Sequence, residues 1–223
     1  MSFISNAANG KPCRSTGQCR EGTSISSAGN SRSASTHLSE RSSASDQICF
    51  ATLAVDGTVT IVFTDIVDST VLTSRLGDHA WRDVLRRHDT VIRDVTGHHG
   101  GTVVETQGDG SMLAFSSARR AVACAQVIQR DMSTAFPDDS PPIRIRIGVH
   151  TGDAIQEADR FFGTTVHYAA RVASQALGGE VLVSNLVREL VANSGVQFTE
   201  SREVELKGLD GAHRLFAVDL TDR

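Results

Sequence analysis

The segment TVTIVFTDI, residues 58–66, constrains the fold of this chain more than any other part of the sequence. It is apolar and β-branched almost throughout, which is typical of a buried strand. The segment ends next to the acid Asp65 and is followed by Asp68, Ser69 and Thr70, residue types that often begin helices. A buried strand that leads into a helix predicts a sheet with helices packed on it.

Strand and helix patterns alternate along the rest of the chain, and short turn signals separate them. These patterns predict a mainly antiparallel sheet with helices on one side, an α/β sandwich related to the ferredoxin-like arrangement. The expected elements after the first strand are a helix around residues 81–95, a hairpin over 101–116, a helix around 121–132, a strand over 143–155, a helix over 163–176, and then a strand, a short helix and a closing antiparallel pair.

Residues 1–50 differ in character from the rest of the chain. They are rich in Ser, Asn, Gly and Arg without apolar periodicity, so they cannot bury enough apolar surface to offset the entropy of ordering them. We expect a disordered Ser-rich tail before a single domain over residues 58–220. The alternatives for this tail are a phosphorylated or partner-binding arm, an inert extension, and a misjudged start of translation.

Charge, hydropathy and cysteine usage narrow the class of partner. The net charge of −4 and the pI near 6.0 provide no basic surface for nucleic acid and no polybasic stripe for a membrane. No run approaches the roughly 18 apolar residues that span a bilayer, and no secretory signal is present. We therefore expect a cytoplasmic protein with a small-molecule or protein partner. The four cysteines, Cys13, Cys19, Cys49 and Cys124, form no CxxC pair, which argues against disulfides and zinc.

Two acids stand at the ends of predicted strands. Asp65 closes the first strand, and Asp109 lies at the tip of the hairpin that should pair beside it. Adjacent strands lie about 4.8 Å apart, so carboxylates at neighbouring strand ends can share two metal ions, which suits phosphoryl chemistry. Each acid alone also has an ordinary interpretation, because Gly-Asp-Gly is a common hairpin turn and an acid after a strand is often a helix cap.

Four motifs in this order and at these separations resemble the class III adenylate and guanylate cyclase catalytic domain: FTDIVDST, GDG, IGVHTG and FGTTVHYAARV. The separation of the two acids also fits that family. The resemblance covers about residues 58–220 and ends in ELKGLDGAHRLFAV. It implies the class III nucleotide cyclase fold and the conversion of a purine nucleoside triphosphate, GTP or ATP, to a 3′,5′-cyclic nucleotide and pyrophosphate for intracellular signalling.

The resemblance also implies roles for individual residues. Asp65 and Asp109 would bind two Mg²⁺ or Mn²⁺ ions, with the backbone carbonyl of Ile66 as a further ligand. Arg171 occupies the position of the family's transition-state arginine, although it could instead be a surface ion-pair residue. Lys207 resembles a lysine that contacts the triphosphate, although a solvated loop lysine fits as well. The family further implies a homodimer with active sites at the interface, where one subunit provides the metal aspartates and the other the transition-state residues.

Three residues depart from the pattern of the family's adenylate cyclases. Glu105 replaces a Lys, Arg160 replaces an Asp or a small polar residue, and His167 replaces an Asn. His167 and Arg171 are four residues apart and share one helix face, so His167 is either a catalytic group or a packing residue. No residue matches the family's additional phosphate-clamping arginine, because Asp153 falls where some members carry it.

Glu105 and Arg160 allow an inference about the purine. Ionised Glu105 only accepts hydrogen bonds and Arg160 only donates them, so the pair is complementary to guanine. Alternatively, Glu105 and Arg160 pair with each other and close the pocket when no base is bound.

Three functions therefore stay open at this point. The first is an active cyclase, favoured by the intact aspartates and Arg171. The second is a degenerate cyclase-like domain of low or no turnover that binds nucleotide or dimerises, favoured by the three substitutions. The third is a ferredoxin-like interaction module, which leaves the two strand-end acids beside a glycine turn unexplained.

Overall fold

The computed structural model of the chain describes residues 56–136 and 142–221. The expectation of a disordered tail over residues 1–50 therefore lies outside the described residues, as do three of the four cysteines. Within the described part, no helix has both the length and the apolar character needed to cross a membrane.

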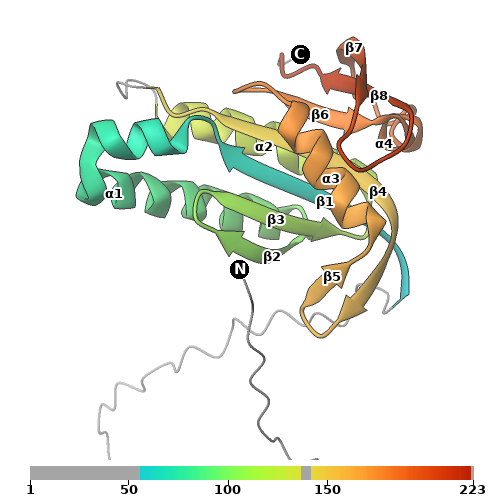
Figure 1. Ribbon diagram of the computed structural model, residues 1–223, viewed down its shortest axis with the longest axis horizontal. Helices are drawn as coiled ribbons and strands as arrows, with labels where there is room; N and C mark the ends of the chain where they lie inside the picture. The colour runs from blue at the N-terminus through green and yellow to red at the C-terminus, as the bar shows by residue number, and fades with distance from the viewer. Residues whose placement is uncertain (1–55, 137–141, 222–223) are drawn as a thin grey trace, which may run out of the picture. The chain divides into compact units, whose positions relative to one another are not determined.

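The described residues form one sheet with helices packed on it, and the element types and their order agree with the sequence patterns (Figure 1). The strands and helices are β1 (Asp56–Ile66), α1 (Ser69–His98), β2 (Thr102–Gln107), β3 (Gly110–Phe115), α2 (Ala118–Ala135), β4 (Ile145–Glu157), β5 (Arg160–Phe162), α3 (Thr164–Gln175), β6 (Val181–Ser184), α4 (Asn185–Leu190), β7 (Phe198–Glu205) and β8 (Ala212–Val218).

The sheet has the order β2-β3-β1-β4-β6-β8-β7, and β5 pairs with β4 beside this path. Only the β4–β6 pair is parallel among the described strands. The prediction of a mainly antiparallel sheet is thus confirmed. Strand β1 lies between β3 and β4, and Ile61 and Val62 are fully buried, as its apolar sequence predicts.

Both faces of the sheet carry helices, and alternate residues of β1 show this. Val62 belongs to the large core that the sheet forms with α1, α2 and α4, whereas Ile61 belongs to a second cluster that includes Ala169 of α3. Figure 1 accordingly shows α3 in front of the sheet and α2 behind it. The expectation that all helices lie on one side is therefore wrong for α3.

Close packing between β4 and α3 explains this second layer. A Cβ atom at Gly148 would lie only 2.1 Å from the backbone nitrogen of Ala173, so the helix backbone sits directly on the strand. On its sheet side α3 presents small side chains, including Ala169 and Ala173, which are buried. Any larger residue at position 148 would have to push α3 away from the sheet.

The first two helices differ in how regular they are. Asp68 stands at the N-cap of α1, but it has a φ of 57° and makes no side-chain capping hydrogen bond. The predicted long helix is interrupted at Gly77, where φ is 77° and ψ is 162°. Helix α2 is regular and buries the predicted apolar face, including Cys124. Burial raises the pKa of the Cys124 thiol to about 12, so this residue is an unreactive core residue.

Candidate active site

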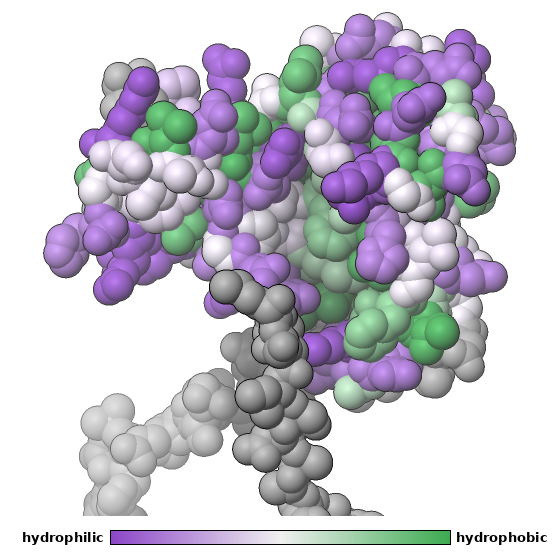
Figure 2. Space-filling model, in the orientation of Figure 1, coloured by the Kyte–Doolittle hydropathy of each residue, from purple (hydrophilic) through white to green (hydrophobic). Residues whose placement is uncertain are grey.

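An open cleft of about 270 Å³ lies between α3 and the sheet where strands β1 to β4 approach one another. Figure 2 shows this face of the molecule hollowed, with hydrophobic residues inside the hollow. Strand residues supply both charged and apolar walls, and α3 supplies small side chains. The lining residues are Phe63, Thr64, Asp65, Glu105, Gln107, Gly110, Ser111, Met112, Arg146, Ala170, Ala173 and Ser174.

The Asp65 side chain is positioned by the strands on either side of β1. In the register of the sheet, Asp65 lies opposite Gly110 of β3 on one side and opposite Arg146 of β4 on the other. The Arg146 guanidinium donates two hydrogen bonds to the same carboxylate oxygen, Oδ2, from Nε at 2.9 Å and from Nη2 at 2.5 Å. A Cβ atom at Gly110 would lie 3.6 Å from the other oxygen, Oδ1, so the glycine leaves space beside it.

Asp109 lies in the turn of the β2–β3 hairpin, directly before Gly110. The turn starts at Gly108, whose φ of 64° is the permissive angle that the Gly-Asp-Gly sequence predicts. Because Gly110 pairs with Asp65, the hairpin turn that carries Asp109 lies beside the end of β1.

The donor groups at this position suit a hard divalent cation. The predicted ligands are the carboxylates of Asp65 and Asp109 and the main-chain carbonyl of Ile66, whose own side chain is buried in the core. No group of three or more His, Cys, Asp and Glu side chains that could hold a metal occurs among the described residues. Mg²⁺ and Mn²⁺ fit such a site, because they commonly use one or two carboxylates and take their other ligands from water and substrate phosphates.

The two residues proposed to recognise the base lie on different elements. Glu105 on β2 is exposed and lines the cleft, whereas Arg160 on β5 is exposed and is not among the lining residues. In the part of the chain that the structure describes, these two side chains form no ion pair with each other. The alternative in which Glu105 and Arg160 close the pocket is therefore not realised within one chain.

The predicted transition-state residues lie outside the cleft of this chain. On α3, His167 is exposed and Arg171 is half-buried, but only Ala170, Ala173 and Ser174 line the cleft. Lys207 is exposed in the connection between β7 and β8. Of the predicted site residues, Asp65 and Glu105 line the cleft of a single chain, and Asp109 lies in the adjoining β2–β3 turn without lining it. Arg160, His167, Arg171 and Lys207 are not among the lining residues either.

The middle of α3 is anchored to the sheet by an aromatic cluster. The ring of Tyr168 stacks on His150 of β4 at 3.9 Å, and its hydroxyl lies 3.0 Å from Nδ1 of His213 on β8. Burial, together with the nearby His213, lowers the pKa of His150 to about 4, so this imidazole is neutral at pH 7. The histidine of the IGVHTG motif therefore positions α3 as a neutral packing group.

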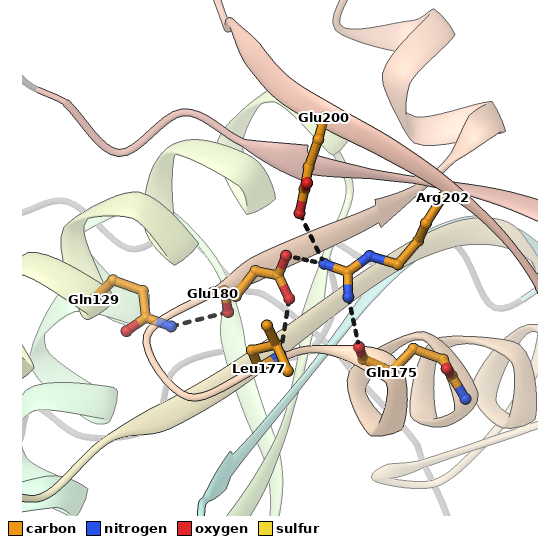
Figure 3. A network of polar contacts seen from close by, with 6 residues as sticks. All are labelled: Gln129, Gln175, Leu177, Glu180, Glu200 and Arg202. Carbon is orange, nitrogen blue, oxygen red and sulfur yellow. Dashed lines mark hydrogen bonds and ion pairs between the residues drawn. The ribbon is translucent and has the colours of Figure 1, made fainter.

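A network of polar contacts holds the C-terminal end of α3 (Figure 3). Arg202 of β7 donates to the carbonyl of Gln175 at 3.3 Å and forms an ion pair with Glu180. The other Glu180 carboxylate oxygen accepts from the Leu177 amide at 2.7 Å, and the Glu180 carbonyl accepts from Gln129 of α2 at 3.0 Å. The helix that carries His167 and Arg171 is therefore fixed at its middle and at its end.

Sequence reasoning missed several lining residues, and Arg146 is the most important of them. The alternating strand IRIRIGVHTG contains Arg146, but only the register between β1 and β4 places it opposite Asp65. Gln107 and Ser174 were also missed. The sequence could have indicated Arg146 only if the predicted strands over residues 58–66 and 143–155 had been aligned antiparallel. In that alignment, as in the structure, Arg146 lies opposite Asp65.

Comparisons with known proteins find similar sequences and folds for the described domain. The family model of the adenylate and guanylate cyclase catalytic domain matches residues 54–219. A protein of Rhizobium meliloti (strain 1021) is 32% identical over 144 residues, which are 63% of this chain and 24% of that protein. An adenylate cyclase of Lachancea kluyveri is 30% identical over 154 residues, which are 58% of this chain and 8% of that protein.

Among solved structures, the crystal structure of the guanylyl cyclase Cya2 superimposes with a TM-score of 0.66 at 26% identity, covering 73% of this chain and 92% of that chain. The present chain thus spans less than half the length of the first curated relatives that it matches, and nearly all of this structural neighbour.

Proposed function

Because the chain belongs to the adenylate and guanylate cyclase catalytic domain family, we propose that it converts a purine nucleoside triphosphate to the 3′,5′-cyclic nucleotide and pyrophosphate in intracellular signalling. The catalytic domain of this proposal spans residues 58–220. The observation that carries the proposal is the pairing of Asp65 with Gly110. It puts Asp109, the turn residue directly before Gly110, beside the end of β1 that lines the open cleft with Asp65.

In this proposal the two aspartates and the Ile66 carbonyl hold two Mg²⁺ or Mn²⁺ ions. When bound, such ions lower the pKa of the ribose 3′-hydroxyl and neutralise the triphosphate. Arg171 donates hydrogen bonds to the α-phosphate oxygens as their negative charge grows. His167 orients the ribose from the same helix face, and Lys207 contacts the triphosphate.

The proposal requires a homodimer with active sites at the interface. Its support is that Arg171 and His167 do not line the cleft of their own chain. A symmetric dimer can place α3 of one subunit over the aspartates of the other, and each pair of subunits then forms two equivalent sites.

A degenerate domain that binds nucleotide without turnover is the second candidate. The observation that favours it is the Arg146 guanidinium, which occupies one oxygen of Asp65.

Product formation separates the two candidates. The purified chain, incubated with Mn²⁺ and either GTP or ATP, is expected to form a cyclic nucleotide that mass spectrometry detects. Nucleotide binding without any cyclic product would support the degenerate domain instead.

The choice of purine has to be argued from the residues, since the chain is similar to proteins named for either base. We expect a preference for GTP over ATP of about tenfold or more, because a polar pocket mismatched to the wrong base loses hydrogen bonds. In this proposal Glu105 accepts from guanine N1 and N2 in the cleft, and Arg160, an exposed side chain that does not line the cleft in this structure, donates to O6. In the double variant Glu105→Lys with Arg160→Asp, the ratio of GTP to ATP turnover should shift towards ATP.

The control for this experiment is the double variant Glu203→Lys with Arg214→Asp. These residues form a cross-strand pair between β7 and β8 outside the cleft and undergo the same changes of charge. The control should keep the parent ratio. A parent enzyme that prefers ATP, or a swap that leaves the ratio unmoved, would contradict this assignment of the base pocket.

A further inference from the structure

Arg146 is the basic side chain of the cleft, and its position next to a proposed metal ligand is unusual. Its Nε and Nη2 atoms both donate to Oδ2 of Asp65. Both partners are only partly accessible, with 35% of the Arg146 side chain and 31% of the Asp65 side chain exposed. A guanidinium in this position neutralises the carboxylate and occupies one of its oxygens.

The two oxygens of Asp65 face different surroundings. Oδ2 is engaged by Arg146 of β4, whereas Oδ1 faces the space beside Gly110 of β3, the residue that follows Asp109. Oδ1 is therefore turned towards the first residue of β3, which directly follows the second acid, and no described residue donates to it. A cation shared by the two aspartates can reach Oδ1, but a second cation needs the oxygen that the guanidinium holds.

We propose that Arg146 competes with a divalent cation for Oδ2 of Asp65 and moves to the triphosphate when nucleotide binds. This inference rests on the proposed function, because it assumes that Asp65 is a metal ligand. Without nucleotide, the positive charge of Arg146 opposes cation binding. With nucleotide, the guanidinium gains phosphate oxygens as partners, and Asp65 is released to the cation.

This coupling makes two predictions of opposite sign for the variant Arg146→Gln. Without nucleotide, Arg146→Gln should bind Mn²⁺ about two- to fivefold more tightly than the parent, because a partly exposed ion pair has an effect of that order. The same variant should bind 3′-deoxy-GTP or 3′-deoxy-ATP, which lack the attacking hydroxyl, more weakly by a similar factor. A purely structural role of Arg146 would produce neither change.

The experiment measures free Mn²⁺ by electron paramagnetic resonance in titrations of the full chain at a fixed pH. Arg144→Gln is the matched control, because Arg144 lies two residues away on the same side of the chain, is exposed and makes no ion pair with Asp65. Arg144→Gln should bind Mn²⁺ like the parent, and Asp65→Asn should bind it more weakly. Arg146→Lys keeps the charge but lacks the two-donor fork, so it should fall between the parent and Arg146→Gln.

The outcomes separate this inference from the proposed function. An Mn²⁺ affinity of Arg146→Gln equal to or lower than that of the parent overturns the inference, and if Arg146→Gln does not fold, the same criterion applies to Arg146→Lys. If the parent forms cyclic nucleotide while the Mn²⁺ affinity is unchanged in the variant, the inference alone fails. If the parent forms no product while Arg146→Gln binds Mn²⁺ more tightly, the competition for Asp65 stands as a property of a metal-binding domain, and only the proposed turnover fails.

Discussion

Replacing either Asp65 or Asp109 by Asn is expected to reduce cyclic nucleotide formation by about a thousandfold or more. Each change removes one of the two carboxylates proposed to hold the cations, and a metal ion in such a site stabilises the transition state by several kcal/mol. The measurement is the rate of cyclic product formation by mass spectrometry at saturating Mn²⁺.

The fold should survive both substitutions. Asp65 is only partly buried, and its pair with Arg146 is partly exposed to water, so the loss of this pair should cost about 1 kcal/mol or less. Asp109 lies in a surface turn between β2 and β3. Thermal unfolding monitored by circular dichroism should therefore show melting temperatures near that of the parent.

The matched control is Asp68→Asn, in the same FTDIVDST segment. Asp68 is exposed, makes no capping hydrogen bond and has a φ of 57°, an angle that Asn tolerates. This variant should keep the activity of the parent. Substantial turnover in folded Asp65→Asn or Asp109→Asn would show that these acids are not the metal ligands.

Local patterns predicted most of the fold, because the signals that define strands and helices lie within short segments. The apolar, β-branched run 58–66 is a central strand, and the Gly108-Asp109-Gly110 turn closes a hairpin, as expected. Both features depend on neighbours in the sequence: a run of apolar, β-branched residues defines the strand, and a glycine that accepts a positive φ defines the turn.

Features that depend on contacts between distant segments could not be predicted in this way. The placement of α3 on the opposite face of the sheet depends on the close approach of Gly148 to Ala173, which no local periodicity reveals. Arg146 acquires its importance only through the register of β4 against β1. The resemblance to the family located Asp65 and Asp109, but it carried no information on a residue that pairs with Asp65.

The relation of Arg171 to the aspartates could not be derived from one chain, since Arg171 lies outside the cleft that Asp65 lines. The roles of Arg171, His167 and Lys207 accordingly stay predictions, and a dimer is the arrangement that would bring them to the aspartates. Mixing two inactive variants tests this arrangement directly.

A mixture of Asp65→Asn and Arg171→Ala chains is expected to recover about a quarter of the parent activity, although each variant alone is inactive. In a mixed dimer, one site combines the intact aspartates of the Arg171→Ala chain with the intact Arg171 of the Asp65→Asn chain. Random assembly makes about half of all dimers mixed, and each mixed dimer has one complete site of two. The measurement is cyclic product formed by dimers that were unfolded, mixed and refolded with two different affinity tags.

The control mixture combines Asp65→Asn with Asp109→Asn. Both substitutions affect the aspartate half of a site, so every site in that mixed dimer lacks one metal ligand and no activity should return. Recovery in the first mixture alone would establish that one subunit provides the aspartates and the other provides Arg171. If mixed dimers are isolated through both tags and the first mixture stays inactive while the parent is active, the shared site is wrong and Arg171 must act within its own chain or not at all.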